Sequence, residues 1–403
     1  MNFKNTLKSS VAVAALYAVA TPVTAIAADD TFSSGNKNSL KISGQIVKAI
    51  QHVDDGTSDK TYFSDGNWTS SRLRWVASGK LSDTITVGGA IEMNTPQSNT
   101  ADSLTLGTAV GSRGTSADAG AWGIRHSYIY AKHKTAGKLT LGQTSVAADG
   151  SGEAKYTING MFAGSDGSSY GSGVFFNNVA TASAPTNSTV TVGNAITNMD
   201  HAGRADILRY DFPKFMNVSV KTSVKDDGQW DVGAAWSDKF DEFKVQAKAG
   251  FTDTNQDVSK NFIATGSIAV LHDSGLNASM AGGKTGYQNQ YESFGTPVGD
   301  TAGDGIDDPH FFYVGIGYNA KLFGVGGTGF HLGWNTTDNN VLKNNHDDNE
   351  GEAWAISAIQ QFKSIGTEIG IEYANYSYDS KSGTTENTFD DVDALTLMTV
   401  FKF

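Results

Sequence analysis

Hydrophobic and polar residues alternate with a period of two through most of this sequence. In Phe243–Phe251 the odd-numbered residues are apolar or small, and lysine or glutamine occupies most even positions. Val218–Val224 and Trp230–Trp236 show the same alternation. Successive side chains of a β-strand point to opposite faces, so this pattern predicts short strands with one apolar and one polar face.

Segments of this kind recur along the whole chain, and sixteen of them qualify as strands. They cover approximately residues 40–53, 67–80, 84–94, 121–133, 137–144, 203–212, 216–225, 229–238, 242–253, 261–272, 275–286, 309–320, 325–336, 352–363, 367–378 and 393–403. Each has about the length that a tilted strand needs to cross the hydrocarbon layer of a membrane.

The connections between these strands alternate between short and long. Tight turns are expected near 81–83, 134–136, 213–215, 239–241, 273–274, 321–324 and 364–366. Long, polar and acidic connections are expected near 54–66, 95–120, 145–202, 287–308, 337–351 and 379–392. Membrane barrels of the bacterial outer membrane have this asymmetry, with short periplasmic turns and longer external loops.

A closed barrel accounts for these features together. No apolar stretch after residue 28 is long enough to cross a bilayer as a helix. A spanning strand needs only every second residue to face lipid, and in lipid a sheet has to close on itself because every backbone group must be paired. About sixteen strands enclose an aqueous channel. The sequence therefore predicts an all-β fold, a transmembrane antiparallel β-barrel of about 16 strands.

One connection, residues 145–202, is too long to be a simple turn. It is rich in Gly, Ser, Asn and Ala, and it carries the acids Asp149, Glu153 and Asp166. A structureless insertion of this length inside a compact fold is usually functional. We expect it to fold into the lumen as a pore-constricting loop, with its carboxylates facing arginines on the wall. Which of the three carboxylates reaches the constriction stays open.

The N-terminus predicts export. Lys4 and Lys8 precede an apolar run over 11–20, and small residues follow at 25–27. This is the layout of a signal peptide, so residues 1–27 are expected to be cleaved from a single barrel domain over 28–403. The formal net charge is −12, and loss of the two lysines makes it more negative. An acidic chain does not suit nucleic acid, and a chain without cysteine has no disulfides.

Several motifs, taken in order, carry a resemblance to a known family. They are Leu40–Gln45 in the first strand, Ser70–Ser82 in the second, Gly137–Gln143 before the long loop, Arg204–Pro213 after it, and the terminal Phe403. With these motifs the chain resembles the general diffusion (non-specific) porins of Gram-negative outer membranes, of the alphaproteobacterial type.

The resemblance implies a function and partners. It implies a sixteen-stranded homotrimer in the bacterial outer membrane, whose third loop narrows each water-filled pore, and passive diffusion of small hydrophilic solutes and ions. Outer-membrane lipid and lipopolysaccharide would surround the barrel, and the barrel-assembly machinery would recognise Phe403. No cofactor and no nucleic-acid partner are expected.

The family's constriction arginines are matched by Arg72, Arg125 and the pair Arg204 and Arg209. Alternation of side chains also places Arg74 inward with Arg72, and it places Arg209 inward. Arg204 falls on the lipid-facing side unless a bulge intervenes. Arg125 is expected inward because the side chains expected to face outward in its strand are Trp122, Ile124, Tyr128 and Tyr130.

Alternative interpretations remain for several of these features. The inward arginines could simply pair with neighbours such as Glu92. A substrate-selective porin would use the long third loop as a binding site. A barrel enzyme of the lipase type would need a serine, a histidine and an acid together; Gly167–Gly171 fits a nucleophile motif but lies in a glycine-rich loop. We expect no enzyme. Asp300–Asp308 has oxygen ligands at calcium-like spacing, with a solvated external loop as the simpler explanation.

Overall fold

The computed structural model describes residues 31–33, 38–66, 68–95, 106, 122–162, 164–168, 170–178, 186–254, 260–287, 308–341, 348–382 and 385–403. The predicted signal peptide, residues 1–27, lies outside this range, as do residues 300–307 of the acidic segment. Among the described residues, no helix is both long enough and apolar enough to cross a membrane.

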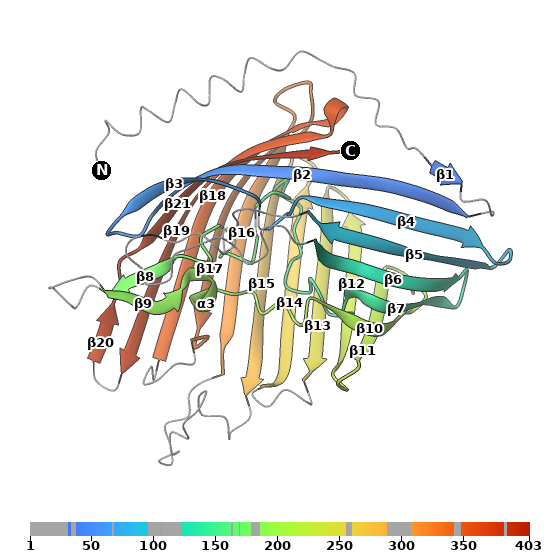
Figure 1. The fold of residues 1–403 in the computed structure, drawn as a ribbon, viewed down its shortest axis with the longest axis horizontal. Coiled ribbons are helices and arrows are strands. Elements are labelled where there is room, and N and C mark those ends of the chain that lie inside the picture. Colours follow the sequence, from blue (N-terminus) through green and yellow to red (C-terminus); the bar gives the residue numbers. More distant parts are fainter. Residues whose placement is uncertain are drawn as a thin grey trace.

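Sixteen strands form a closed antiparallel barrel (Figure 1). They are β2 (Ser39–Asp54), β4 (Arg72–Lys80), β5 (Ile85–Asn94), β6 (Gly123–His133), β7 (Gly137–Ser145), β10 (Arg204–Asp211), β11 (Val218–Lys225), β12 (Trp230–Phe240), β13 (Phe243–Asp253), β14 (Lys260–His272), β15 (Leu276–Tyr287), β16 (His310–Ala320), β17 (Thr328–Asp338), β18 (Asp348–Phe362), β19 (Thr367–Ser382) and β21 (Val392–Lys402). Each strand pairs with the next, and β21 pairs with β2 to close the barrel. The predicted fold class is confirmed.

Smaller elements extend the barrel or lie between its strands. Strand β1 (Thr31–Ser33) pairs with the start of β2, while β3 (Asp59–Ser64) and β20 (Thr385–Thr388) form hairpins with β2 and β19. Strands β8 (Phe175–Asn178) and β9 (Thr186–Thr191) form a separate two-stranded sheet. The helical elements α3 (Val192–Ala195) and η3 (Lys363–Ile365) are single turns.

The outward face of the strands is apolar, as a lipid-facing surface requires. In β17, Phe330, Leu332 and Trp334 are exposed, whereas the alternating residues His331 and Asn335 are buried on the other side. Because the exposed side chains are the hydrophobic ones, burial is inverted relative to a soluble sheet. The apolar face therefore contacts lipid and the polar face lines the lumen.

The second strand begins later than predicted. The sequence pattern placed it over 67–80, but β4 starts at Arg72. Residues 65, 66 and 68–71 lie between β3 and β4 and outside both strands; along β2, residues 39–45 pair with β4 and residues 49–54 pair with β3. Side chains hold this segment: Gln45 Nε2 donates to Thr69 Oγ1 at 2.7 Å, and the Val47 amide donates to Ser71 Oγ at 2.8 Å. These hydrogen bonds replace strand pairing in this segment. The period-two pattern of the sequence cannot distinguish such a segment from a paired strand.

Candidate pore constriction

The connection between β7 and β10, residues 146–203, is loop 3, and it lies along the inner wall of the barrel. Inward-facing side chains of successive strands bind its backbone in order. The contacts are Ala147 N to Ser223 Oγ, 2.8 Å; Ala148 N to Asp231 Oδ1, 2.8 Å; Ala154 N to Ser267 Oγ, 2.9 Å; Ile158 N to Asn319 Oδ1, 2.9 Å; Asn335 Nδ2 to Ser165 O, 2.6 Å; and Gln51 Nε2 to Tyr170 O, 3.1 Å. The loop thus follows the wall from β11 round to β2.

Glycines on the inner face of the strands allow this close approach. A Cβ at Gly233 would lie 2.1 Å from the carbonyl oxygen of Ala147, and one at Gly329 would lie 2.2 Å from that of Ile158. Real Cβ atoms do not approach backbone this closely. These glycines are therefore required where loop backbone meets wall backbone.

On the wall, three arginines surround one carboxylate. Glu92 on β5 is 5% exposed. Arg125 Nε lies 2.9 Å from its Oε1, Arg72 Nη1 lies 3.4 Å from the same atom, and Arg74 Nε lies 3.6 Å from Oε2. Three guanidinium charges thus share a single counter-charge, and the group keeps a positive surplus. The pairing with Glu92 that was the alternative interpretation is present in the structure.

A bulge in β6 changes the faces predicted for that strand. The pairing with β5 shifts between Glu92 and Met93, so Glu92 opposes His126 while Met93 opposes Ile124. Arg125 is the extra residue at this position and still reaches Glu92. The bulge inverts the alternation beyond it.

The prediction that Tyr128 and Tyr130 face outward is therefore wrong. They oppose Ala90 and Gly88, which share the inward face of β5, and a Cβ at Gly88 would lie 2.7 Å from the Tyr130 hydroxyl. Ile129, 65% exposed, takes the outward face instead. Alternation within β6 alone could not reveal the change, because a bulge is a property of the strand pair.

The two arginines of β10 differ in their surroundings. Arg209 donates from Nε to Asp211 Oδ1 at 2.8 Å and from Nη1 to the Ser145 carbonyl at 2.7 Å. Arg204 lies at the first position of β10, an even number of residues from the exposed Leu208, and the register with β7 is regular between them. The regular register leaves the backbone of Arg204 on the face that alternation assigned to it, but its charge acts on Arg125 and His126, so the guanidinium lies within electrostatic range of the wall group.

The predicted acidic residues of loop 3 lie in two places. Glu153 accepts from Asn198 Nδ2 at 3.3 Å, and burial raises its pKa, with Lys155 opposing the shift and Asp149 adding to it. Asp166 accepts from the Ser168 hydroxyl at 3.1 Å. Asp149 and Glu153 come from the first part of the loop and Asp166 from the later part, but the charges of both aspartates act on Glu153, so the structure brings the three acids within electrostatic range of one another.

Asp200 joins this acidic group, and the sequence analysis missed it. The Gly150 amide donates to Asp200 Oδ1 at 2.9 Å, and its carboxyl shares a hydrogen bond with that of Asp149. Burial, with the charges of Asp149 and Glu153, raises the pKa of Asp200 to about 8. Asp200 lies at the far end of the loop from Asp149, so only the folded loop brings the two together.

Trp68 is a second residue that the sequence analysis did not identify. It lies on the segment that leaves the sheet before β4, and the Lys155 ammonium lies 5.3 Å from the centroid of its ring. A cavity of about 10 Å³ separates Trp68 from Glu153, Lys155 and Tyr313. This space has room for about one water molecule, so the Trp68 ring lies close against loop 3.

No metal site accompanies these groups in the part of the chain that the structure describes, where His, Asp and Glu form no cluster that could hold an ion. The motif Gly167–Gly171 lies in turns of loop 3, and its Ser169 is outside the described residues.

Solved outer-membrane proteins share this fold. OmpT of Vibrio cholerae, solved in a trimer form, aligns with a TM-score of 0.54 and 13% identity over 91% of this chain and 100% of its own. An anion-selective porin from Comamonas acidovorans gives the same values of score, identity and coverage. The outer membrane channel DcaP of Acinetobacter baumannii aligns with a TM-score of 0.54 and 14% identity over 92% of this chain and 99% of its own. Identities this low show a common fold and no more.

Sequence comparison places the chain more narrowly. Among curated proteins no sequence matches it. The sequence model of the Gram-negative porins matches residues 12–384, which is nearly the whole chain. A match of this extent agrees with the barrel and with the predicted resemblance. The chain belongs to the Gram-negative porins, which form channels in the outer membrane.

Proposed function

We propose that this porin is a non-specific diffusion channel in which small hydrophilic solutes and ions pass between a basic wall and an acidic loop. The basic side consists of Arg72, Arg74 and Arg125, and Arg209 on β10 contributes to the same side. The acidic side is drawn from Asp149, Glu153 and Asp166, and Asp200 adds its charge only when the pH rises through its pKa of about 8. The observation that carries the proposal is the array of three guanidiniums around the single carboxylate of Glu92.

The charge surplus has a direct physical consequence. At physiological salt the Debye length is about 8 Å, so charges lining a narrow passage are only partly screened from a solute between them. A positive wall opposite a negative loop sets up a transverse field that orients water and dipolar solutes. Apolar solutes would disrupt this ordered water, and hydrophilic ones replace it. Charged groups lining a pore tune ion preference without tight binding.

The assembly and surroundings are part of the same proposal. We infer a homotrimer, supported by the trimer form of a structural neighbour, with lipid and lipopolysaccharide around the barrel. The signal peptide is removed, the barrel-assembly machinery recognises the terminal Phe403, and the channel needs neither catalysis nor a cofactor. Native electrophoresis of the detergent-extracted protein tests the trimer, and a species of monomer size alone would contradict it.

Conductance measurements in a planar bilayer test the diffusion function. A non-specific channel gives a single-channel current that rises in proportion to salt concentration, and hydrophilic solutes pass according to size. Current blocked in a saturable manner by one sugar or anion would instead establish a substrate-selective porin with a binding site on loop 3.

A further inference from the structure

Loop 3 does more than cross the lumen. Beyond Tyr170 it builds the β8–β9 hairpin and the single turn α3, and these lie at the end of the barrel that carries the long loops (Figure 1). The constriction described above uses none of these residues. Their packing shows a separate role.

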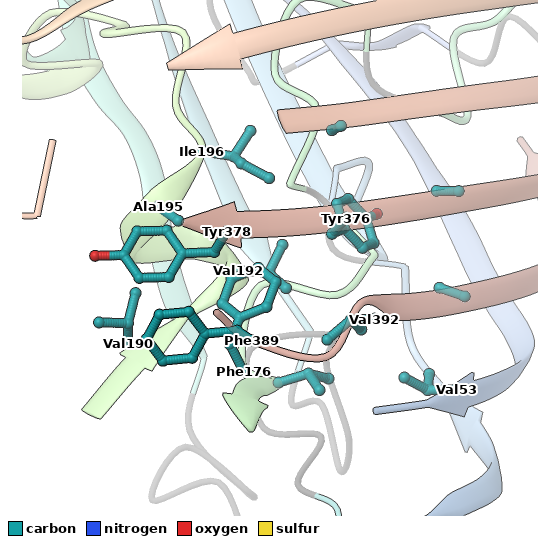
Figure 2. Packing of buried hydrophobic residues seen from close by; sticks show 14 of the residues in the cluster. Val53, Phe176, Val190, Val192, Ala195, Ile196, Tyr376, Tyr378, Phe389 and Val392 are labelled. Atoms are coloured by element: carbon teal, nitrogen blue, oxygen red, sulfur yellow. The ribbon is translucent and has the colours of Figure 1, made fainter. Parts of the chain in front are cut away.

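The hairpin is docked through the largest apolar cluster in the described protein. Loop 3 contributes Val174, Phe176, Val190, Val192, Ala195 and Ile196 to this cluster, and the wall contributes Val53, Ala353, Ala374, Tyr376, Tyr378, Val392 and Ala394 (Figure 2). Phe176 is fully buried and stacks on Tyr378, with ring centroids 5.5 Å apart. Tyr378 in turn contacts Phe389, at 5.0 Å.

These wall residues are on the lumen side of their strands. In β21, Val392 and Ala394 are buried while Leu395 is exposed on the opposite face. In β19, Tyr376 and Tyr378 are buried while Ile371, on the other face, is exposed. The hairpin therefore lies inside the external mouth, against the ends of β18, β19, β21 and β2, and not on the outer surface of the barrel.

Hydrogen bonds connect the hairpin to neighbouring external loops. Asn177, 1% exposed, donates from Nδ2 to the Asp55 carbonyl at 2.9 Å and to Thr57 Oγ1 at 3.2 Å. Its own carbonyl accepts from the Asp390 amide at 2.9 Å. The side chain of Asn177 is thus bound by residues before β3, and its backbone carbonyl is bound by a residue after β20. The described strands β8 and β9, bound on two sides and buried at their base, therefore have a fixed position.

We propose that the β8–β9 hairpin is a fixed outer filter, which narrows the external mouth and limits the size of solutes that reach the constriction. It acts in series with the constriction and depends on bulk, because residues 175–191 contain no charged side chain. The channel thus has two selective levels: size at the mouth, and charge deeper in the lumen.

A hairpin deletion tests this directly. Phe175 and Thr191 oppose each other in the β8–β9 sheet, so replacing residues 176–190 with Asn-Gly joins them through a two-residue hairpin turn. The contacts of residues 147–171 with the wall are untouched. We expect larger single-channel conductance, and faster entry of a trisaccharide relative to a monosaccharide in vesicle-swelling assays. The reversal potential in a salt gradient should stay unchanged, which separates this proposal from the role of the arginines.

A reversible cross-link between the hairpin and a neighbouring loop provides a control that does not depend on the folding of the deletion variant. The chain contains no cysteine, so the thiols of Asn177→Cys with Thr57→Cys, placed at the observed contact, can be joined by a short bifunctional methanethiosulfonate reagent (the oxidised protein) and released by a reductant (the reduced protein). In the background Phe176→Ala, the oxidised protein should behave as the unmodified porin, and the reduced protein should resemble the deletion. If the deletion and the reduced protein have the conductance and the sugar ratio of the unmodified porin, the outer filter is overturned.

Discussion

Removing charge from the basic wall should shift ion preference towards cations. We consider Arg72→Gln together with Arg125→Gln, because glutamine keeps an amide that can still donate to Glu92. Three guanidiniums and one carboxylate give this group a net charge of about two positive units. After the double substitution only Arg74 and Glu92 remain, and the group is neutral.

The size of the effect follows from Coulomb's law. An ion roughly 8 Å from one guanidinium interacts with it by about 0.5 kcal/mol in water, and screening over one Debye length leaves about 0.2 kcal/mol. Two such charges contribute about 0.4 kcal/mol, which changes the local population of a monovalent cation about twofold and that of an anion about twofold in the opposite sense. The permeability ratio of cations to anions should therefore rise roughly three- to fourfold.

Reversal potentials across a planar bilayer with a salt gradient measure this ratio. The matched control is Lys134→Gln with Lys239→Gln, which removes the same charge from exposed positions beside the turns. Electrophoretic mobility with and without heating shows whether each variant is folded. A wall variant that is folded but has the reversal potential of the control would refute the reasoning, because the arginines would then not face the ion path.

Three further predictions concern the loop and the lipid face. Asp200 has a pKa of about 8, above that of a free carboxyl, so it becomes negatively charged as the pH rises through this value. The preference of the channel for cations, measured as the reversal potential, should therefore increase from about pH 6 to 9. Asp200→Asn should abolish this increase. Gly329→Val should push loop 3 from the wall, since a Cβ there meets the Ile158 carbonyl, and single-channel recordings should show altered or unsteady conductance; Gly266→Ala, where the nearest atom lies at 3.5 Å, should leave it steady. Leu332→Lys places a charge on the lipid face and should cost about 2–4 kcal/mol in urea-dependent refolding into vesicles, whereas an unchanged midpoint would contradict the assigned face.

The strands could be predicted because their signal is local. Each strand of a membrane barrel has one face towards lipid and one towards water, and the alternation in Phe243–Phe251 follows from these two faces. Strand β13 lies where this pattern placed it. The two errors arose where pairing with a neighbour decides the outcome. The pattern continues before β4, but residues 69–71 form hydrogen bonds with Gln45 and Val47 of β2, and β6 contains a bulge opposite Glu92. The sequence of a single strand does not show how that strand pairs with its neighbour.

The constriction could be predicted less completely than the barrel. Arg72 and Arg125 were identified from the family resemblance, and alternation in the second strand added Arg74; in the strand of Arg125 the alternation is interrupted by a bulge. The acids of loop 3 were chosen by residue type, since the loop has no period from which to infer direction. Asp200 and Trp68 depend on contacts between segments far apart in the chain, so only the folded loop reveals them.

The contacts of Glu92 show that two interpretations of the arginines do not exclude each other. Three guanidiniums close together repel one another, and a buried anion between them lowers the cost of holding them there. Glu92 is 5% exposed and touches all three. It therefore fixes the positions of the arginines while neutralising only one of their charges. The structural ion pairs and the basic side of the constriction that we propose are the same arrangement of side chains.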